Sequence, residues 1–550
     1  MNNGDMEPIG AIASPRLQSK LSLYQRYLLL ITAAVSSSCG LAVELLLGTL
    51  ASYLVGNQAL SYGVAVGGFL AAMGLGAYLS RFVAPDDTHE EQPARLQQAF
   101  VWIELSLAPL CAIAPLSLFA LFVSDGPFWI ALFLATLLLG ALSGMELPLL
   151  TRLLERDEGL KDALAGVLAL DYIGALVGSL ALPIVLLPWL GLFPSAVLIG
   201  AVQAGMVVAI GILFPSFKRW GRIGLALALA LLILLPVVVP LGDRLENSLY
   251  KAPVISRIQS PYQRIILTRQ GRDVRLFLDG NLQFSSLDEY RYHEALVHPA
   301  LSANTKLRQE ENASQLSSKT SSGSVKSKFR KVLLLGAGDG LALREVLKWS
   351  DVDRVVLIDL DQVVVNLAQH HPFLVKANAN SFADPRVEVI QGDAFLLAPA
   401  LAETFDVILA DFPDPDRPVI AKLYAQGFYQ RLLSRLAPNG IFVTQASSPF
   451  FAPRAFACVA ATLRSLQLQT YPYTVDVPSF GPWGFVLATR SPLEFDQLPL
   501  PVTTRFLTQN LLSTLFELPK DLLLEDVEIN RLAHPVIVKY QDDPRWSSYD

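Results

Sequence analysis

Residues 332–348 read VLLLGAGDGLALREVLK, an apolar strand pattern followed by a glycine-rich turn and then a helical pattern. Glycines at such a turn let the backbone approach a ligand closely. The next apolar run, RVVLID, ends on Asp359, about 20 residues beyond the turn, where an acidic side chain can bind ribose hydroxyls. Because a glycine turn alone is weak evidence, the segments around it decide what it means.

Three more apolar strand patterns follow, RVEVIQGDA, FDVILADFPDP and GIFVTQA, each with an acidic or polar residue at its carboxyl end. This alternation of strand and helix predicts an α/β Rossmann-like domain over residues 329–490. Ligands of open α/β sheets bind at the carboxyl ends of the strands. We therefore expect Asp339, Asp359, Asp393 and Asp411 to converge on one crevice.

Residues 1–242 have a different character, which raises the hydrophobic share of the chain to 52% and its mean hydropathy to +0.42. A helix that crosses about 30 Å of hydrocarbon needs roughly 18 or more mostly apolar residues. Seven stretches meet this requirement and predict a multi-pass α-helical membrane domain: 27–54, 58–80, 98–123, 127–150, 163–187, 192–214 and 222–241.

Four carboxylates fall at or inside these predicted spans: Glu44, Glu104, Glu146 and Asp171. An ionised group at the bilayer centre costs at least about 2.5 to 3.5 kcal/mol. Two interpretations remain open. The carboxylates are protonated or paired packing groups, or they line a path for cations. Glycines between Gly63 and Gly76 favour close helix packing in either case.

Between the two predicted domains, residues 243–301 combine alternating strands with a helical stretch from Asp288 to Leu301. The Gln270-Gly271 pair predicts a hairpin turn, so this part is expected to form a small β subdomain with a connecting helix. Residues 302–328 are rich in Ser, Lys, Asn and Gln and predict a flexible loop. Residues 491–550 predict a C-terminal extension that packs on the sheet or on the membrane domain.

The net charge of −6, with a single short basic run at Lys326 to Lys331, argues against nucleic-acid binding. The three cysteines form no disulfide framework: Cys39 and Cys111 fall in apolar spans, and Cys458 stands alone. Histidines and cysteines show no ligand spacing for a metal, so no metal is expected.

Several motifs of the second half occur together in one order: SPYQRIILTR (260–269), LFLDGNLQFSSLDEYRYHEALVHPAL (276–301), LLLGAGDGLALREVLK (333–348), VEVIQGDA (387–394) and DFPDPDRP (411–418). In order, spacing and content, residues 255 to 490 resemble spermidine synthase, the polyamine aminopropyltransferase family, in a form fused to a membrane domain. The resemblance implies transfer of the aminopropyl group of decarboxylated S-adenosylmethionine, a co-substrate and not a tightly bound cofactor, to a primary amine. Methylthioadenosine is the implied by-product.

The resemblance also implies roles for individual residues. Those that match the donor site of the family are Gln263, Gln283, His293, Asp339, Asp359, Asp393, Ala394 and Pro418. Those that match its amine site are Tyr292, Asp411 and Asp414. The implied catalytic residue is Asp411, which would orient the attacking nitrogen and accept its proton. Carboxylates suit this site because the sulfonium donor and the amine acceptor are both cations.

The chain departs from the usual family pattern at three positions. Asp359 replaces a more common Glu, Phe480 stands where a Tyr helps to hold the diamine, and Arg417 is an unusual neighbour for a cationic acceptor. The identity of the acceptor therefore stays open, with putrescine as the default and a longer polyamine or agmatine as alternatives.

Two other functions remain open from the sequence: a polyamine transporter or sensor whose Rossmann-like half only binds, and an S-adenosylmethionine-dependent methyltransferase. The expected partners are a small amine and the lipid bilayer, and a homodimer is one open assembly state. We expect a multi-pass protein of the cell (inner) membrane. The presumed donor places the catalytic half in the cytoplasm, whereas the positive-inside rule applied to seven spans places it on the opposite side.

Overall fold

The computed structural model describes residues 22–55, 58–83, 92–318, 329–522 and 526–541. The chain divides into two compact units, Met1–Leu249 and Tyr250–Asp550. The first unit thus extends past residue 242, because its last helix continues to Leu249. The positive-inside argument counts the lysines and arginines that flank the spans, and two of these, Arg16 and Lys20, lie outside the described residues.

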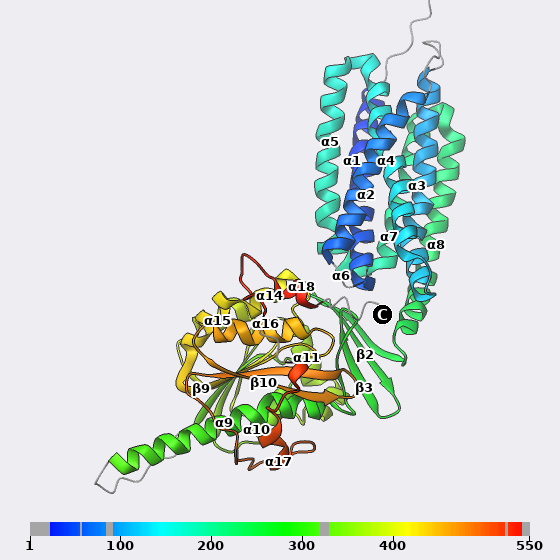
Figure 1. Ribbon diagram of the computed structural model, residues 1–550. Helices are drawn as coiled ribbons and strands as arrows, with labels where there is room; N and C mark the ends of the chain where they lie inside the picture. The colour runs from blue at the N-terminus through cyan, green and yellow to red at the C-terminus, as the bar shows by residue number, and fades with distance from the viewer. Residues whose placement is uncertain (1–21, 56–57, 84–91, 319–328, 523–525, 542–550) are drawn as a thin grey trace, which may run out of the picture. The chain divides into compact units, whose positions relative to one another are not determined.

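The first unit is a helical bundle (Figure 1). Its helices are α1 (Leu23–Val55), α2 (Gln58–Leu79), α3 (Gln92–Val123), α4 (Phe128–Glu158), α5 (Leu160–Ala181), α6 (Leu187–Leu190), α7 (Leu192–Leu213) and α8 (Lys218–Leu249). One π turn, Leu182–Leu186, joins α5 to α6. Among the described residues, seven helical segments are long and apolar enough to cross a membrane, which confirms the predicted number of apolar helices.

Close packing of α2 on α4 depends on glycine, as the sequence predicts for this stretch. A Cβ atom built on Gly76 would lie 1.9 Å from the carbonyl oxygen of Ala141, and one built on Gly144 would lie 2.1 Å from the carbonyl oxygen of Met73. No side chain fits at these distances, so the two backbones can approach only where both positions lack one.

The second unit begins with a four-stranded antiparallel sheet of order β1-β2-β3-β4. Its strands are β1 (Val254–Gln259), β2 (Arg264–Gln270), β3 (Asp273–Leu278) and β4 (Asn281–Ser285). The hairpin between β2 and β3 turns at Gly271, whose φ of 61° lies in the left-handed region that glycine tolerates. This confirms the predicted hairpin.

Helix α9 (Glu289–Ser318) corrects the predicted loop at 302–328. The helix continues 17 residues beyond Leu301, and residues 319–328 are outside the described part. Two contacts explain the continuation: Leu307 is buried in the core, and Lys306 Nζ donates to the carbonyl oxygens of Glu494 and Asp496 at 2.9 and 3.0 Å. A polar composition does not prevent a helix from forming when one face packs on a neighbouring element.

A seven-stranded sheet forms the centre of the second unit, in the order β10-β11-β9-β8-β5-β6-β7. Its strands are β5 (Arg330–Gly336), β6 (Val352–Asp359), β7 (Val387–Gln391), β8 (Phe405–Asp411), β9 (Leu436–Gln445), β10 (Gln469–Val477) and β11 (Gly481–Thr489). Strands β5 to β9 are parallel, and β10 and β11 are antiparallel to their neighbours. This is the predicted Rossmann-like arrangement.

Helices cover both faces of this sheet (Figure 1). Besides α9 they are α10 (Leu341–Leu347), α11 (Gln362–His370), α12 (Pro372–Ala377), α13 (Ala394–Leu397), α14 (Pro418–Ala421), α15 (Gln426–Leu432), α16 (Pro453–Arg464), α17 (Gln509–Thr514) and α18 (Ile537–Gln541). The C-terminal extension packs on the sheet domain, because Leu515, Ile537 and Tyr540 are buried in the hydrophobic core around the seven-stranded sheet. Residues 542–550 are not described.

Candidate active site

Strand register places the predicted acids along one edge of the large sheet. Gly336, the last residue of β5, is paired with Asp411 on β8, and Asp359, the last residue of β6, is paired with Gln391 on β7. Asp393 follows two residues after Gln391, and Asp339 follows three residues after Gly336. The four acids therefore lie at the carboxyl ends of neighbouring parallel strands, as predicted.

The glycine turn fits tightly between these acids. Gly336 has a φ of 77°, and a Cβ atom on it would lie 2.2 Å from the carbonyl oxygen of Asp411. A Cβ atom on Gly338 would lie 2.5 Å from Oδ2 of Asp359. Asp339 accepts a hydrogen bond from the amide of Leu341 at 2.9 Å, which fixes its carboxylate at the start of α10. Glycine is required at both positions because a side chain would displace an acid of the site.

Asp411 is joined to a residue from another part of the chain. The hydroxyl of Tyr292, on α9, donates to Oδ1 of Asp411 at 2.6 Å. Burial and the charge of Asp339 raise the pKa of Asp411 to about 6, although His293 and the Tyr292 hydrogen bond act in the opposite direction. Burial and Asp411 also raise the pKa of Tyr292 well above its usual value, so the hydroxyl keeps its proton and donates.

Asp414 has a separate set of partners. Its Oδ1 accepts hydrogen bonds from Ser447 Oγ at 2.7 Å and from Gln445 Nε2 at 3.4 Å. Burial raises the pKa of Asp414 to about 6, and these two bonds lower it in part. Ser447 also accepts from Gln541 Nε2 at 2.8 Å, so the C-terminal extension contacts the residue after β9 that holds Asp414.

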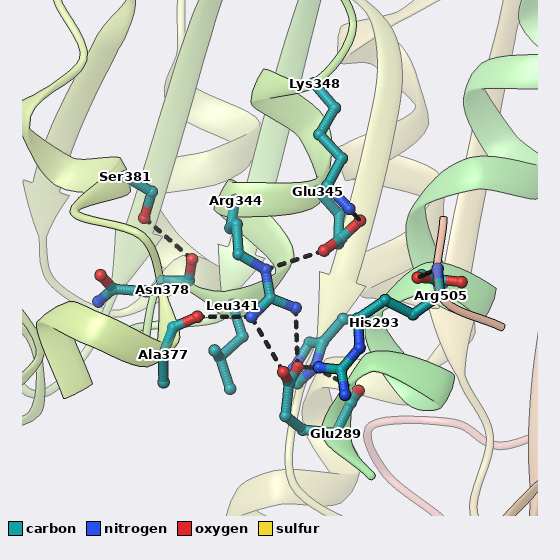
Figure 2. A network of polar contacts seen from close by, with 12 residues as sticks. Glu289, His293, Leu341, Arg344, Glu345, Lys348, Ala377, Asn378, Ser381 and Arg505 are labelled. Atoms are coloured by element: carbon teal, nitrogen blue, oxygen red, sulfur yellow. Dashed lines mark hydrogen bonds and ion pairs between the residues drawn. The ribbon is translucent and has the colours of Figure 1, made fainter. Parts of the chain in front are cut away.

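His293 is held by a pair of residues that the sequence did not single out (Figure 2). Its Nδ1 lies 2.8 Å from the carbonyl oxygen of Glu289 and 3.0 Å from Oε2 of the same residue. Arg344, on α10, donates to both carboxylate oxygens of Glu289 at 2.9 Å. The i,i+4 spacing of Glu289 and His293 was visible in the sequence, whereas nothing there pointed to Arg344.

The acidic residues around His293 raise the pKa of its ring. Burial by itself lowers the pKa of His293, but the hydrogen bond that its Nδ1–H donates to Glu289 and the negative charges of Asp339, Glu289 and Asp411 more than offset it and raise the pKa to about 9. His293 is therefore protonated at neutral pH. The positive charge of His293 lowers the pKa of Asp411. The ring of His293 also contacts the ring of Tyr292, with 5.1 Å between the centroids.

Gln263 and Asp359 both connect to Asp361, a further residue that the sequence did not single out. Gln263 Nε2 donates to Oδ2 of Asp361 at 3.0 Å, and Ser260 Oγ donates to the same oxygen at 2.6 Å. Asp359 accepts from the amide of Asp361 at 2.9 Å, and burial raises the pKa of Asp359 to about 6. The signal for Asp361 was its position before a helix, since it caps α11.

The remaining predicted residues are less tightly connected to the acids. Asp393 caps α13 and forms an ion pair of 2.7 Å with Lys422, so it has a structural role at the start of that helix. Ala394 is buried at the start of α13, and Pro418 is exposed at the start of α14. Gln283 lies on β4 of the small sheet, and the hydrogen bond described for its side chain goes to the carbonyl oxygen of Asn281 at 3.2 Å.

The three residues that depart from the family pattern, Phe480, Arg417 and Asp359, each have contacts in the structure. Phe480 packs edge-on against Tyr292, with 6.2 Å between ring centroids, so it adds an apolar wall to the site. Arg417 lies 3.7 Å from Asp279 and 3.1 Å from Asp416, and these carboxylates offset its charge. Asp359 remains at the end of β6, within hydrogen-bond reach of Asp361.

Residues 289–497 match the model of the spermine/spermidine synthase domain. Polyamine aminopropyltransferase 2 of Ralstonia nicotianae is 39% identical over 94% of this chain and 98% of its own length. The chain belongs to the spermine/spermidine synthase family. It is also 38% identical to the polyamine aminopropyltransferase of Leptospira interrogans, over 94% of this chain and 98% of that protein. These relatives cover both units, so the helical unit is part of the shared architecture.

A crystal structure of spermidine synthase from Thermotoga maritima aligns with 49% of this chain and 87% of its own chain, at 25% identity and a TM-score of 0.41. The family membership makes this chain an aminopropyltransferase. It confirms the resemblance that the motifs of the second half predicted and favours that function over the methyltransferase and binding-only alternatives.

Proposed function

We propose that this enzyme transfers the aminopropyl group of decarboxylated S-adenosylmethionine to a primary amine, with putrescine as the default acceptor. The observation that carries the proposal is the position of Asp411. It is at the carboxyl end of a central strand, bonded to Tyr292, with Asp339 close enough for its charge to act on it.

A site of this composition suits cationic substrates. Asp339, Asp359, Asp411 and Asp414 line one edge of the sheet, and burial raises the pKa of each above its ordinary value. Buried carboxylates gain most from an opposite charge that replaces the water they have lost. The sulfonium and ammonium groups of the donor and the ammonium groups of the amine supply such charges.

The reaction needs a base near the attacking nitrogen, because an ammonium has no lone pair. With a pKa of about 6, Asp411 is ionised at neutral pH and able to accept that proton, directly or through water. The nitrogen lone pair then forms the new bond to the carbon next to sulfur. The carbon–sulfur bond breaks, its electron pair stays on sulfur, and methylthioadenosine leaves as a neutral thioether.

We assign the donor site to the residues that match the family motif: Gln263, Gln283, His293, Asp339, Asp359, Asp393, Ala394 and Pro418. The amine site contains Tyr292, Asp411 and Asp414. The contacts of Asp361 with Gln263 and Asp359 support the donor assignment, because they orient both side chains at the end of β6.

We also propose that the helical unit is embedded in the cell membrane through the seven apolar helices, with the catalytic unit in the cytoplasm, where the donor is made. The length and hydropathy of the helices support the membrane assignment. A reporter enzyme that is active only outside the cytoplasm, fused after residue 550, tests on which side of the membrane the catalytic unit lies. Activity of this reporter would reverse the cytoplasmic assignment.

The catalytic proposal is tested with Asp411→Asn in the purified full chain. We expect methylthioadenosine release from decarboxylated S-adenosylmethionine and putrescine to fall by about 10²- to 10⁴-fold, the usual contribution of a general base. Asp416→Asn is the matched control, since Asp416 is an exposed carboxylate of the same loop. A variant at Asp411 that kept its full rate would overturn the assignment.

A further inference from the structure

Four polar side chains from four helices meet inside the helical unit. Glu104 of α3, Glu146 of α4, Ser36 of α1 and Gln203 of α7 are 0, 5, 2 and 1% exposed. The hydroxyl of Ser36 donates to Oε2 of Glu146, and Ser36 and Gln203 both flank Glu104. We call this group the bundle carboxyl cluster. It is built from the helical unit alone, and none of its residues belongs to the donor or amine site proposed above.

Several polar atoms of the bundle carboxyl cluster have no hydrogen-bond partner. Both carboxyl oxygens of Glu104, Oε1 of Glu146 and Nε2 of Gln203 are buried without a hydrogen-bond partner. The amide oxygen of Gln203 is engaged, since it accepts from Cys111 Sγ at 3.5 Å. Carboxylates buried for a purely structural purpose are normally paired or fully hydrogen-bonded, because an unpaired buried charge costs several kcal/mol.

Among the described groups that act on the two carboxyls, none carries a positive charge. The titratable side chains that act on them are Cys39 of α1, Cys111 of α3 and Asp171 of α5, which are neutral or acidic. In the part of the chain that the structure describes, neither Glu104 nor Glu146 forms an ion pair with a lysine, arginine or histidine. The charge of Glu104 also acts on Glu146, so ionising both together is especially costly.

The bundle is tightly packed next to Gln203. The gap between Gln203, Cys111, Ser143 and apolar side chains such as Val43 and Phe69 leaves no room for a water molecule. A buried pair of carboxyls without a cation is stable when it holds a proton, since one proton neutralises one acid and lets it donate to an unpaired oxygen of the other.

We propose that Glu104 and Glu146 form a proton-binding site inside the helical unit, in which the two carboxyls share one exchangeable proton and Ser36 and Gln203 orient them. The ligand of this site is the proton itself. Because gain or loss of that proton changes the charge at the centre of the bundle by one unit, the site links the packing of α1, α3, α4 and α7 to pH.

Infrared difference spectroscopy on the full chain in lipid vesicles tests this proposal, with the spectrum of the double variant Glu104→Gln/Glu146→Gln subtracted from that of the wild type. We expect the carbonyl stretch of a protonated carboxyl at neutral pH. The band should shift when the sample is transferred to D₂O and disappear reversibly as the pH is raised. Glu44→Gln is the matched control, a buried carboxyl of α1 outside the cluster, and it should leave the cluster's band in place.

Three results would overturn the proposal. A difference spectrum without a protonated-carboxyl band would mean that both groups are ionised. A band that neither shifts in D₂O nor changes with pH would mean a sealed structural acid. Loss of the band at constant pH on addition of putrescine or sodium chloride would mean that the ligand is an amine or a metal cation. Methylthioadenosine release by the same variants tests the catalytic unit separately, so failure of one proposal leaves the other open.

Discussion

The hydroxyl of Tyr292 donates to Oδ1 of Asp411 at 2.6 Å, although 119 positions separate the two residues in the chain. This bond ties the helix α9 to the carboxyl end of β8. It lowers the pKa of Asp411 and so opposes the effect of burial, which keeps the carboxylate available as a base near neutral pH.

Tyr292→Phe removes that hydrogen bond and keeps the ring in place. We expect the pKa of Asp411 to rise above about 6, because the bond stabilises the ionised form. The acidic limb of the pH–rate profile should move to higher pH. Steady-state rates of methylthioadenosine release from pH 5 to 9 measure this shift. An unchanged acidic limb would show that Asp411 does not govern it.

The wild-type enzyme should lose activity as the pH falls through about 6. Both Asp411 and Asp414 have a pKa raised to about 6, so acid protonates the proposed base and one of the proposed amine contacts in the same range. The loss of kcat/KM for the amine should be reversible on return to neutral pH. Circular dichroism over the same range separates it from unfolding, and a rate that stayed constant down to pH 5 would contradict the assignment of both groups.

Glu289→Gln should alter the charge of His293. The variant keeps the size of the side chain but removes the carboxylate that contributes most to the raised pKa of His293. We expect the pKa to fall toward the ordinary value of about 6.5, so the ring becomes neutral at physiological pH. The change is measured by histidine NMR and by the basic limb of kcat/KM for the donor.

The matched control for Glu289→Gln is Asp384→Asn, which breaks the ion pair of 2.8 Å between Asp384 and Arg386 elsewhere in the same domain. It should leave the pKa of His293 unchanged. Should both variants shift the profile equally, the effect of Glu289 would be a general loss of charge or stability and not the positioning of His293.

Gly338→Ala should weaken donor binding. The added Cβ atom would lie 2.5 Å from Oδ2 of Asp359, so either the turn or the carboxylate must move. We expect KM for decarboxylated S-adenosylmethionine to rise by about tenfold or more, as about 1.4 kcal/mol of lost interaction gives a factor of ten. Gly427→Ala, where the new Cβ lies 3.4 Å from Leu532, is the control and should bind the donor normally.

The arrangement of the acids could be predicted from the sequence because it follows from secondary structure alone. Each of Asp339, Asp359, Asp393 and Asp411 comes at or just after the end of a buried strand, and parallel strands present their carboxyl ends at one edge. The seven apolar helices were likewise visible, since the length and apolar content of each segment are local properties.

Contacts between distant segments depended on the tertiary structure. Helix α9 continues through residues whose polar composition predicted a loop, because Leu307 is buried in the core. The bidentate contact of Arg344 with Glu289 and the meeting of Glu104 with Glu146 join residues from separate helices. The sequence by itself determined which chemical groups the protein has and at which edge of the sheet its acids lie. Only packing decided which of these groups meet and therefore which protons they hold, because a pKa depends on burial and on neighbours that the chain brings together from far apart.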